Sequence, residues 1–120
     1  MSEVLEVTEI QKALRSFAAE RDWEQFHNPK NLAMALAGEG GELLAEFQWL
    51  TPEQSASPTD EQLKRINEDI ADQKIYTLLL VDKLDINLSN AIKDRISKNS
   101  IKYPKELSKG KEDKSTSLIR

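Results

Sequence analysis

Residues 28–50 read NPKNLAMALAGEGGELLAEFQWL, and this segment has the pattern of one long helix. Asn28 is a favoured N-cap residue, and Pro29 occupies the first helical position, where its missing N–H group is not needed. Side chains advance by about 100° per residue around a helix, so five of the large apolar residues fall in one stripe about 60° wide. The stripe consists of Leu32, Leu36, Leu43, Phe47 and Leu50. The segment therefore predicts a helix from Pro29 to about Leu50 with one buried face.

Three glutamates flank this apolar stripe instead of lying opposite it. Glu39 lies about 20° from the edge of the stripe, and Glu46 and Glu42 lie just beyond it. Three of the four residues 38–41 are glycines, each of which costs a helix interior up to about 1 kcal/mol relative to alanine. We interpret the glycines as room for a close backbone or a bulky group beside the glutamates. The alternative is a kinked helix with surface glutamates.

The rest of the chain reads as further helices separated by prolines. We expect helices over about residues 4–22 and 59–85, and a last one from Asn87 or Ser89 to Tyr103, because strictly alternating β-branched runs are absent. The loop at about 51–58 is short enough to make the second and third helices an antiparallel pair. These patterns predict an all-α fold. We expect one domain over 1–104 and a disordered polar tail over 105–120.

The composition excludes several classes of function. The 120-residue chain has no cysteine and one histidine, which excludes disulfide scaffolds and thiol nucleophiles and argues against catalytic histidine triads. Its net charge of −4 argues against a nucleic-acid polymer or a membrane as partner. No apolar run approaches the ~20 residues that a membrane span needs, and residues 1–10 lack signal-peptide features. We therefore expect a cytoplasmic protein whose abundant chemical group is the carboxylate.

A second acidic pair lies in the third predicted helix. Asp69 and Asp72 are i, i+3 neighbours and share a face, with Glu68 directly before them. Counted from the intervening loop, this pair and the pair Glu39/Glu42 differ in height by only about 3 Å. Four carboxylates are thus expected to converge between two helices. Oxygen ligands without cysteine or usable histidine favour Mg²⁺, with Mn²⁺ as a substitute.

Two alternatives compete with this magnesium site. A di-iron carboxylate bundle needs a Glu-x-x-His pair on two helices, whereas Glu24-x-x-His27 occurs once. A purely structural acidic cluster, compensated by lysines, is the second alternative.

Basic and aromatic side chains offer a complementary surface. Arg95, Asn99 and Lys102 recur at i, i+4 and i+7 of the last predicted helix, where they can bind phosphate or sugar oxygens. Trp23 and Trp49 flank the second helix. Either can stack on a planar ring, although such aromatic residues more often belong to a core.

These segments resemble the MazG-like all-α nucleoside triphosphate pyrophosphohydrolases, and most of all their dCTP-pyrophosphatase-type branch. The resemblance covers about residues 10–104. It rests on ERDWEQFH at 20–27, Pro29, Asn31-Leu32, GE-x-x-EL at 38–43 and FQW at 47–49, with weaker matches at 68–77 and 99–104. It implies an antiparallel four-helix bundle, assembled as a homodimer or a dimer-based homotetramer.

The resemblance also implies site residues. The family's metal signature is Glu-x-x-Glu followed by Glu-x-x-Asp, and the implied ligands are Glu39, Glu42, Asp69 and Asp72. Asp69 replaces the usual glutamate and is one methylene shorter, so Glu68 is a candidate to assist it. Glu39 or Glu42 would also orient the attacking water, which makes both candidate catalytic residues. The implied substrate-binding residues are Trp23, His27, Asn31, Trp49, Tyr76, Arg95, Asn99, Lys102 and Tyr103. Leu14 stands where eukaryotic members have a histidine.

The implied activity is Mg²⁺-dependent hydrolysis of (deoxy)nucleoside triphosphates to the monophosphate and pyrophosphate, as nucleotide-pool cleaning, with dCTP-like substrates favoured. No organic cofactor is expected. An alternative hypothesis, consistent with Asp69 in place of glutamate, is a non-catalytic helical nucleotide- or protein-binding module of the same fold. The expected partners are the nucleotide and further copies of the chain.

Overall fold

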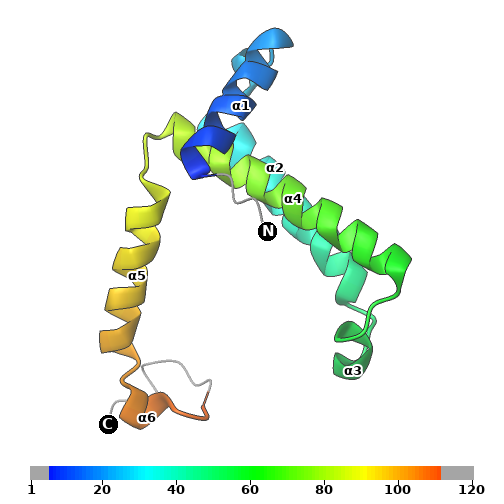
Figure 1. Cartoon of the computed structure of the whole chain (residues 1–120), viewed down its shortest axis with the longest axis vertical. Coiled ribbons are helices and arrows are strands. Elements are labelled where there is room, and N and C mark those ends of the chain that lie inside the picture. Colours follow the sequence, from blue (N-terminus) through cyan, green and yellow to red (C-terminus); the bar gives the residue numbers. More distant parts are fainter. Residues whose placement is uncertain (1–5, 112–120) are drawn as a thin grey trace. The chain divides into compact units, whose positions relative to one another are not determined.

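The computed structural model describes residues 6–111, and the regular structure within them is helical throughout (Figure 1). In chain order the elements are α1 (Val7–Glu20), the 3₁₀ turn η1 (Glu24–Phe26), α2 (Pro29–Phe47), α3 (Pro52–Ser55), α4 (Asp60–Lys83), α5 (Leu88–Lys102) and α6 (Lys105–Ser108). The predicted all-α class is confirmed for this part of the chain. The chain divides between Asp85 and Ile86 into two compact units. The first holds α1 to α4, and the second holds α5 and α6.

The long helices α2, α4 and α5 begin where side chains satisfy their first backbone N–H groups. Asn28 caps α2 by accepting a hydrogen bond from the Asn31 N–H at 2.9 Å, and Asn87 caps α5 in the same way. Thr59 opens α4 with a capping box, in which Thr59 and Gln62 each accept from the other's backbone N–H through their side chains. Such caps stabilise a helix by about 1 kcal/mol each. The predicted helix start at Pro29 is confirmed, and α4 and α5 begin within one residue of the predicted starts, at about residue 59 and at Asn87 or Ser89.

The antiparallel pair of α2 and α4 is the centre of the first unit (Figure 1). Arg65, near the start of α4, lies with its Nε 3.1 Å from a carboxylate oxygen of Glu46, near the end of α2. Further along α4, the Gln73 side chain would lie 3.6 Å from a Cβ built on Gly40 of α2. A later residue of α4 therefore lies next to an earlier residue of α2, as in an antiparallel pair. The predicted antiparallel pairing is confirmed, and it sets residues 39–46 opposite residues 65–73.

Helix α1 packs on the last turns of α4. Arg15 Nη1 and Asp82 Oδ1 form an ion pair at 2.6 Å between the two helices. Ala18 of α1 and Leu78 of α4 are both buried. After α1 the chain reverses at Asp22, whose φ of 55° is left-handed, and η1 leads it to the start of α2. This reversal brings the start of α2 and the end of α1 to the same end of the unit.

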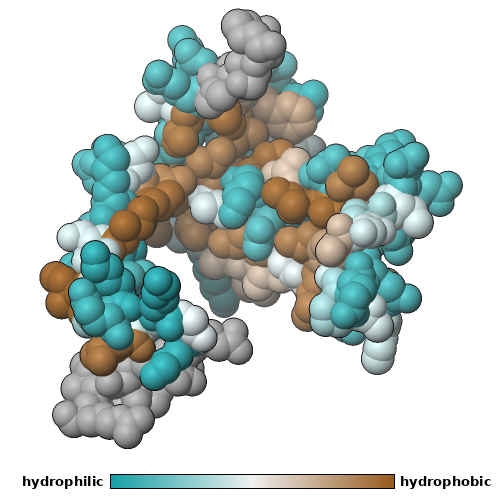
Figure 2. All heavy atoms as spheres, turned by 60° about the horizontal axis from the view of Figure 1, so that its bottom comes forward, coloured by the Kyte–Doolittle hydropathy of each residue, from teal (hydrophilic) through white to brown (hydrophobic). Residues whose placement is uncertain are grey.

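The buried core is small. In the part of the chain that the structure describes, the buried apolar residues are Ala18, Leu32, Ile66, Leu78, Leu79 and Val81, and Leu32 is the one large side chain among them that is fully enclosed. Many large apolar side chains are exposed instead, from Trp49 at 86% to Ile70 at 41%. Figure 2 shows hydrophobic side chains lying between hydrophilic ones on the face that it draws. A chain of this length normally buries more apolar surface.

The structure differs from the predictions mainly at helix ends. Helix α2 stops at Phe47 rather than about Leu50, and the predicted loop at 51–58 contains the short helix α3. The reason is local, because Thr51 and Gln54 form a capping box with Pro52 at the first helical position. Residues 105–108 of the predicted tail form α6, whereas residues 112–120 and residues 1–5 lie outside the described part.

No helix within residues 6–111 is long and apolar enough to cross a membrane. The cytoplasmic location stays a prediction, and so does the domain boundary at residue 104.

Candidate active site

Three carboxylates from α2 and α4 form an acidic group in the first unit. Glu39, Glu42 and Asp69 each bring one carboxylate oxygen within 4.8 Å of the others. Glu39 and Glu42 are three residues apart, so they lie on one side of α2. The antiparallel register of α4 places Asp69 opposite them.

Burial and like charges make the acidic group unfavourable when all its members are ionised. Burial raises the pKa of the Glu39 carboxyl above its ordinary value, and contact with Glu42 raises it further. The charges of Asp72 and Asp69 add to this rise. Burial also raises the pKa of the Asp69 carboxyl, and the charge of Glu46 is the next cause. Each of these neighbours is itself an acid, so a bound cation or proton would reduce the repulsion between the carboxylates.

The residues present fit a hard divalent cation. Glu39 Oε2 is buried and has no hydrogen-bond partner within the described residues. A buried carboxylate oxygen is stable only when it is paired, and a cation among the three carboxylates would pair it. The donors are all carboxylate oxygens, which suit Mg²⁺ or Mn²⁺. The acidic group is therefore a candidate metal centre.

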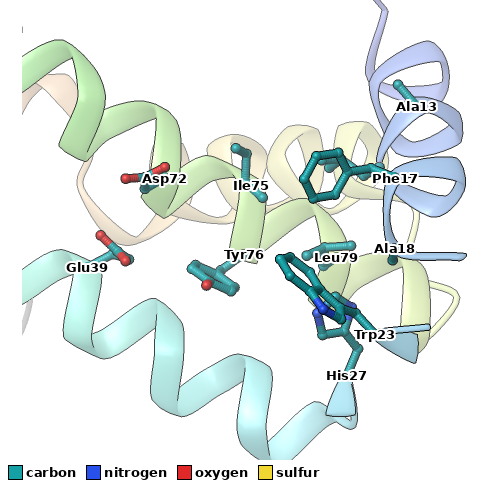
Figure 3. A pocket seen from close by; sticks show the side chains of 11 residues that line it. Ala13, Phe17, Ala18, Trp23, His27, Glu39, Asp72, Ile75, Tyr76 and Leu79 are labelled. Carbon is teal, nitrogen blue, oxygen red and sulfur yellow. The ribbon is translucent and has the colours of Figure 1, made fainter. Parts of the chain in front are cut away.

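Asp72 lies beside the acidic group. It follows Asp69 by three residues on α4 and borders the same pocket as Glu39. Figure 3 shows the Asp72 and Glu39 carboxylates on the facing helices at one end of that pocket. The structure thus brings three of the four predicted ligands into one group and places the fourth next to it.

A pocket of about 510 Å³ opens from the acidic group toward α1. Its size is that of a site for a small organic molecule. Carboxylates line one end, and aromatic side chains line the other, as Figure 3 shows. The polar and aromatic residues of the lining are Phe17, Trp23, His27, Glu39, Asp72 and Tyr76. The arrangement suits a ligand with a planar ring at one end and an anionic, metal-binding group at the other.

Comparison with known proteins gives the family. A family model described as MazG-like matches residues 37–118, a range that includes the whole acidic group. The chain belongs to the MazG-like family. The match runs beyond the predicted end of the domain at residue 104.

Curated relatives of this MazG-like chain carry a more specific name. It is 40% identical over 115 residues to dCTP pyrophosphatase 1 of Mus musculus, covering 93% of this chain and 67% of the mouse protein. It is 38% identical over 114 residues to dCTP pyrophosphatase 1 of Homo sapiens, covering 92% of this chain and 66% of the human one. The chain thus spans about two thirds of the length of these relatives. The predicted resemblance to the dCTP-pyrophosphatase-type branch is confirmed.

A solved structure has the same fold. A pyrophosphatase from Archaeoglobus fulgidus superimposes with a TM-score of 0.78 at 35% sequence identity. The superposition covers 87% of this chain and 97% of the archaeal chain.

Two of the predicted substrate residues of the first unit are not among those that line the pocket. Asn31 donates from its side-chain amide to the Phe26 carbonyl at 3.1 Å and so closes the turn before α2. Trp49 lies past the end of α2 with 86% of its surface exposed. Trp23, His27 and Tyr76, in contrast, all line the pocket.

The remaining predicted substrate residues belong to the second unit of this MazG-like chain. Arg95, Asn99 and Lys102 are exposed on α5, at spacings that give them one side of the helix. Tyr103 ends the helix and is half-buried. These positions remain predictions for phosphate contact.

Two features of the site were missed from the sequence. Phe17 of α1, which was not among the predicted site residues, lines the pocket and is 46% exposed. Glu46 has both carboxylate oxygens within 3.1 and 3.2 Å of Arg65 Nε, which pairs its charge beside Asp69. The second feature had a signal, because Glu46 lies four residues after Glu42 and Arg65 lies four residues before Asp69.

Proposed function

We propose that this chain hydrolyses (deoxy)nucleoside triphosphates to the nucleoside monophosphate and pyrophosphate, with Mg²⁺ at the acidic group and dCTP-like substrates favoured. The chain is a nucleotide pyrophosphohydrolase, as its named relatives in the family are pyrophosphatases. The observation that supports Mg²⁺ and a dCTP-like substrate is that the acidic group borders the pocket with aromatic side chains. Glu39 belongs to both, so one ligand can reach both.

The metal would be held by Glu39, Glu42 and Asp69, with Asp72 as the fourth ligand. When bound, Mg²⁺ would offset the charge of the triphosphate and lower the pKa of a water molecule. The carboxylates themselves repel a triphosphate, so substrate binding depends on that neutralisation. Glu39 or Glu42 would accept a hydrogen bond from the attacking water and so orient it.

The base would occupy the aromatic end of the pocket. Trp23 and Tyr76 offer ring faces and His27 offers ring nitrogens to a planar, polar base. Trp49 and Asn31 are proposed as further substrate contacts. With the base at this end, the phosphate chain points toward Glu39 and Asp72 at the other end. This orientation would bring the α-phosphorus toward the carboxylates proposed to orient the water.

The phosphates would also be bound by Arg95, Asn99, Lys102 and Tyr103. Guanidinium and ammonium groups bind terminal phosphate oxygens strongly, and an amide can bind a phosphate or the sugar.

We further propose that the active form is a homodimer or a dimer-based homotetramer in which the four-helix bundle is complete. Support comes from the small core and from the apolar side chains left exposed on both units, among them Met34, Leu44, Ile92 and Ile96. Burial of such residues contributes about 25 cal/mol per Å².

The test is pyrophosphate release from a panel of dNTPs and NTPs, with Mg²⁺ and with chelator. The expected result is release that requires the metal and is fastest with dCTP or a related pyrimidine. Glu42→Gln should lower the rate by about 100-fold or more, since weaker perturbations around a metal site already cost 10–100-fold. Glu53→Gln on the exposed short helix α3 is the matched control and should behave like the parent. No turnover of any nucleotide, or equal rates for Glu42→Gln and the parent, would contradict the proposal.

A further inference from the structure

The end of α1 has an unusual backbone. Asp22 adopts a left-handed conformation with φ 55°, which non-glycine residues rarely do. The Trp23 N–H donates to the Ala18 carbonyl at 2.9 Å, and the Asp22 N–H donates to the Ala19 carbonyl at 3.1 Å. This is a Schellman motif in which aspartate occupies the position that usually holds glycine.

Asp22 is tied into this conformation by the next turn. The Gln25 side-chain amide donates to the Asp22 carbonyl at 3.0 Å and lies 3.1 Å from the Asp22 carboxylate. Aspartate tolerates the left-handed region better than most residues because its short polar side chain can bond locally. The turn therefore has one defined geometry, and that geometry decides where the next residue, Trp23, lies.

The turn brings Trp23 back against Phe17. Their rings meet edge to face, with centroids 5.7 Å apart and planes inclined by 68°. Phe17 and Trp23 both line the pocket, where Figure 3 shows them above the start of α2. Each is also almost half exposed, at 46% and 44%. We call this pair of rings the Phe17–Trp23 wall of the pocket. Because almost half of each residue is exposed, few neighbouring residues fix the positions of the two rings.

Arg21 holds the outer side of this wall. Its guanidinium carbon lies 3.6 Å from the centroid of the Phe17 ring, and its Nη1 donates to the Phe17 carbonyl at 3.1 Å. The hydrogen bond sets the guanidinium over the ring, and the cation–π contact holds the ring in place. Phe17 is therefore contacted by Arg21 as well as by Trp23.

We propose that Arg21 and Asp22 are positioning residues that form the Phe17–Trp23 wall of the base pocket before the nucleotide arrives. This inference rests on the proposed function, because it takes the pocket as the site of the base. Neither residue needs to touch the substrate. Ordering two mobile aromatic side chains on binding would weaken affinity, and a wall ordered in advance avoids that loss. The carboxylates lie on α2 and α4, outside this turn, so we expect the effect on KM rather than on kcat.

The first experiment compares variants at Arg21. Arg21→Met keeps the length of the side chain and loses the guanidinium, and it should raise KM for the best dNTP about tenfold with kcat within about twofold. Arg21→Lys keeps the cation and should recover part of the loss. Arg15→Met is the matched control, since Arg15 also lies on α1 and makes an ion pair with Asp82 that is outside the pocket lining. It should leave KM unchanged.

A second pair of variants isolates the backbone. Asp22→Gly adopts φ 55° without strain and should keep KM near that of the parent. Asp22→Val cannot adopt this conformation readily because it is β-branched. It should rearrange the turn and raise KM about as much as Arg21→Met does. Equal KM values for the glycine and valine variants would overturn the role of the turn.

A spectroscopic measurement separates this inference from the activity. The chain has two tryptophans, so Trp49→Phe leaves Trp23 as the single emitter. In that background Arg21→Met and Asp22→Val should shift Trp23 emission to longer wavelength and increase acrylamide quenching, whereas Asp22→Gly should not. If the parent hydrolyses no nucleotide, the proposed function fails while this measurement still tests the wall. Unchanged Trp23 emission together with an unchanged KM in Arg21→Met would overturn the inference.

Discussion

Glu39 on α2 and Asp69 on α4 are separated by 30 residues in the chain, yet their carboxylate oxygens lie within 4.8 Å of each other. No hydrogen bond within the described residues satisfies the buried Oε2 of Glu39. Repulsion between two ionised carboxylates this close destabilises the folded state, whereas a divalent cation bound between them would stabilise it. The predictions about metal, pH and charge below all follow from this relationship.

Mg²⁺ or Mn²⁺ should stabilise the protein against thermal unfolding. A ligand that binds the folded state alone adds about 2.7 kcal/mol at a concentration 100 times its Kd. Glu42→Gln should lose most of this stabilisation because it removes one member of the acidic group. Thermal unfolding with and without the metal measures the effect, and calorimetry gives the stoichiometry. A metal-induced rise in Tm equal to that of the parent in Glu42→Gln would show that Glu42 is not a ligand.

Without metal, the contribution of Glu39 and Asp69 to the stability of the fold should increase as the solution is acidified toward their ordinary pKa values. The pKa values of Glu39 and Asp69 in the folded state lie above their ordinary values of 4.5 and 3.8. Between the ordinary and the raised pKa the folded state binds more protons than the unfolded state, so stability falls as pH rises through that window and stays lower above it. Urea unfolding in chelator over a pH series measures this dependence.

In the presence of metal, the stability of the fold should instead decrease as the pH is lowered. Protons and cations compete for the same carboxylates, so metal affinity should fall as pH is lowered. A stability that rises with pH in the absence of metal would contradict the assignment of Glu39 and Asp69 as mutually repelling groups.

Arg65 should partly neutralise the Glu46 carboxylate and so weaken its effect on the acidic group. Arg65 Nε contacts both oxygens of Glu46, and the Glu46 charge is the main electrostatic cause of the raised pKa of Asp69. Arg65→Ala leaves that charge unpaired, so the metal-free protein should lose up to about 1 kcal/mol of stability. Its affinity for Mn²⁺ should rise, because a more negative site attracts a cation more strongly.

Arg15→Ala is the control for this prediction. It removes a comparable ion pair, to Asp82, and should change stability without changing Mn²⁺ affinity. Titration with Mn²⁺ followed by electron paramagnetic resonance measures the affinity directly. If Glu46→Gln lowered the Mn²⁺ affinity by as much as Glu42→Gln does, Glu46 would be a metal ligand instead.

Alanine should be tolerated at two glycines of α2. A Cβ at Gly38 or Gly41 would meet nothing within 4 Å among residues 6–111, apart from its own helix backbone and chain neighbours. Each substitution should therefore raise the free energy of unfolding by up to about 1 kcal/mol through helix propensity. Denaturant unfolding measures the change. A loss of stability would mean that the space beside these glycines is filled in the assembled protein.

Much of the fold follows from local patterns. Asn28 with Pro29 predicts the start of the second helix from adjacent residues, and the structure has a helix there. The end of α2 was placed wrongly, because the capping box of Thr51 that begins the next helix went unnoticed. The left-handed Asp22 had no clear signal, because the usual marker of that conformation is glycine.

The site was predicted in part. The i, i+3 spacing of Glu39 with Glu42, and of Asp69 with Asp72, indicates which carboxylates share a helix face. It does not indicate which of the two aspartates comes closest to the glutamates. In the structure Asp69 joins the acidic group and Asp72 lies beside it at the pocket.

By itself the sequence therefore determined the helices, their caps and the faces on which the acids lie, because these depend on hydrogen bonds and periodicity over three or four residues. Only the tertiary structure decided that Glu39 meets Asp69, that Arg65 pairs Glu46, and that Phe17 packs on Trp23. Those contacts depend on the rotation and register of one element against another. A shift of one residue turns a helical side chain by about 100°, so only the packed structure selects the side chains that meet.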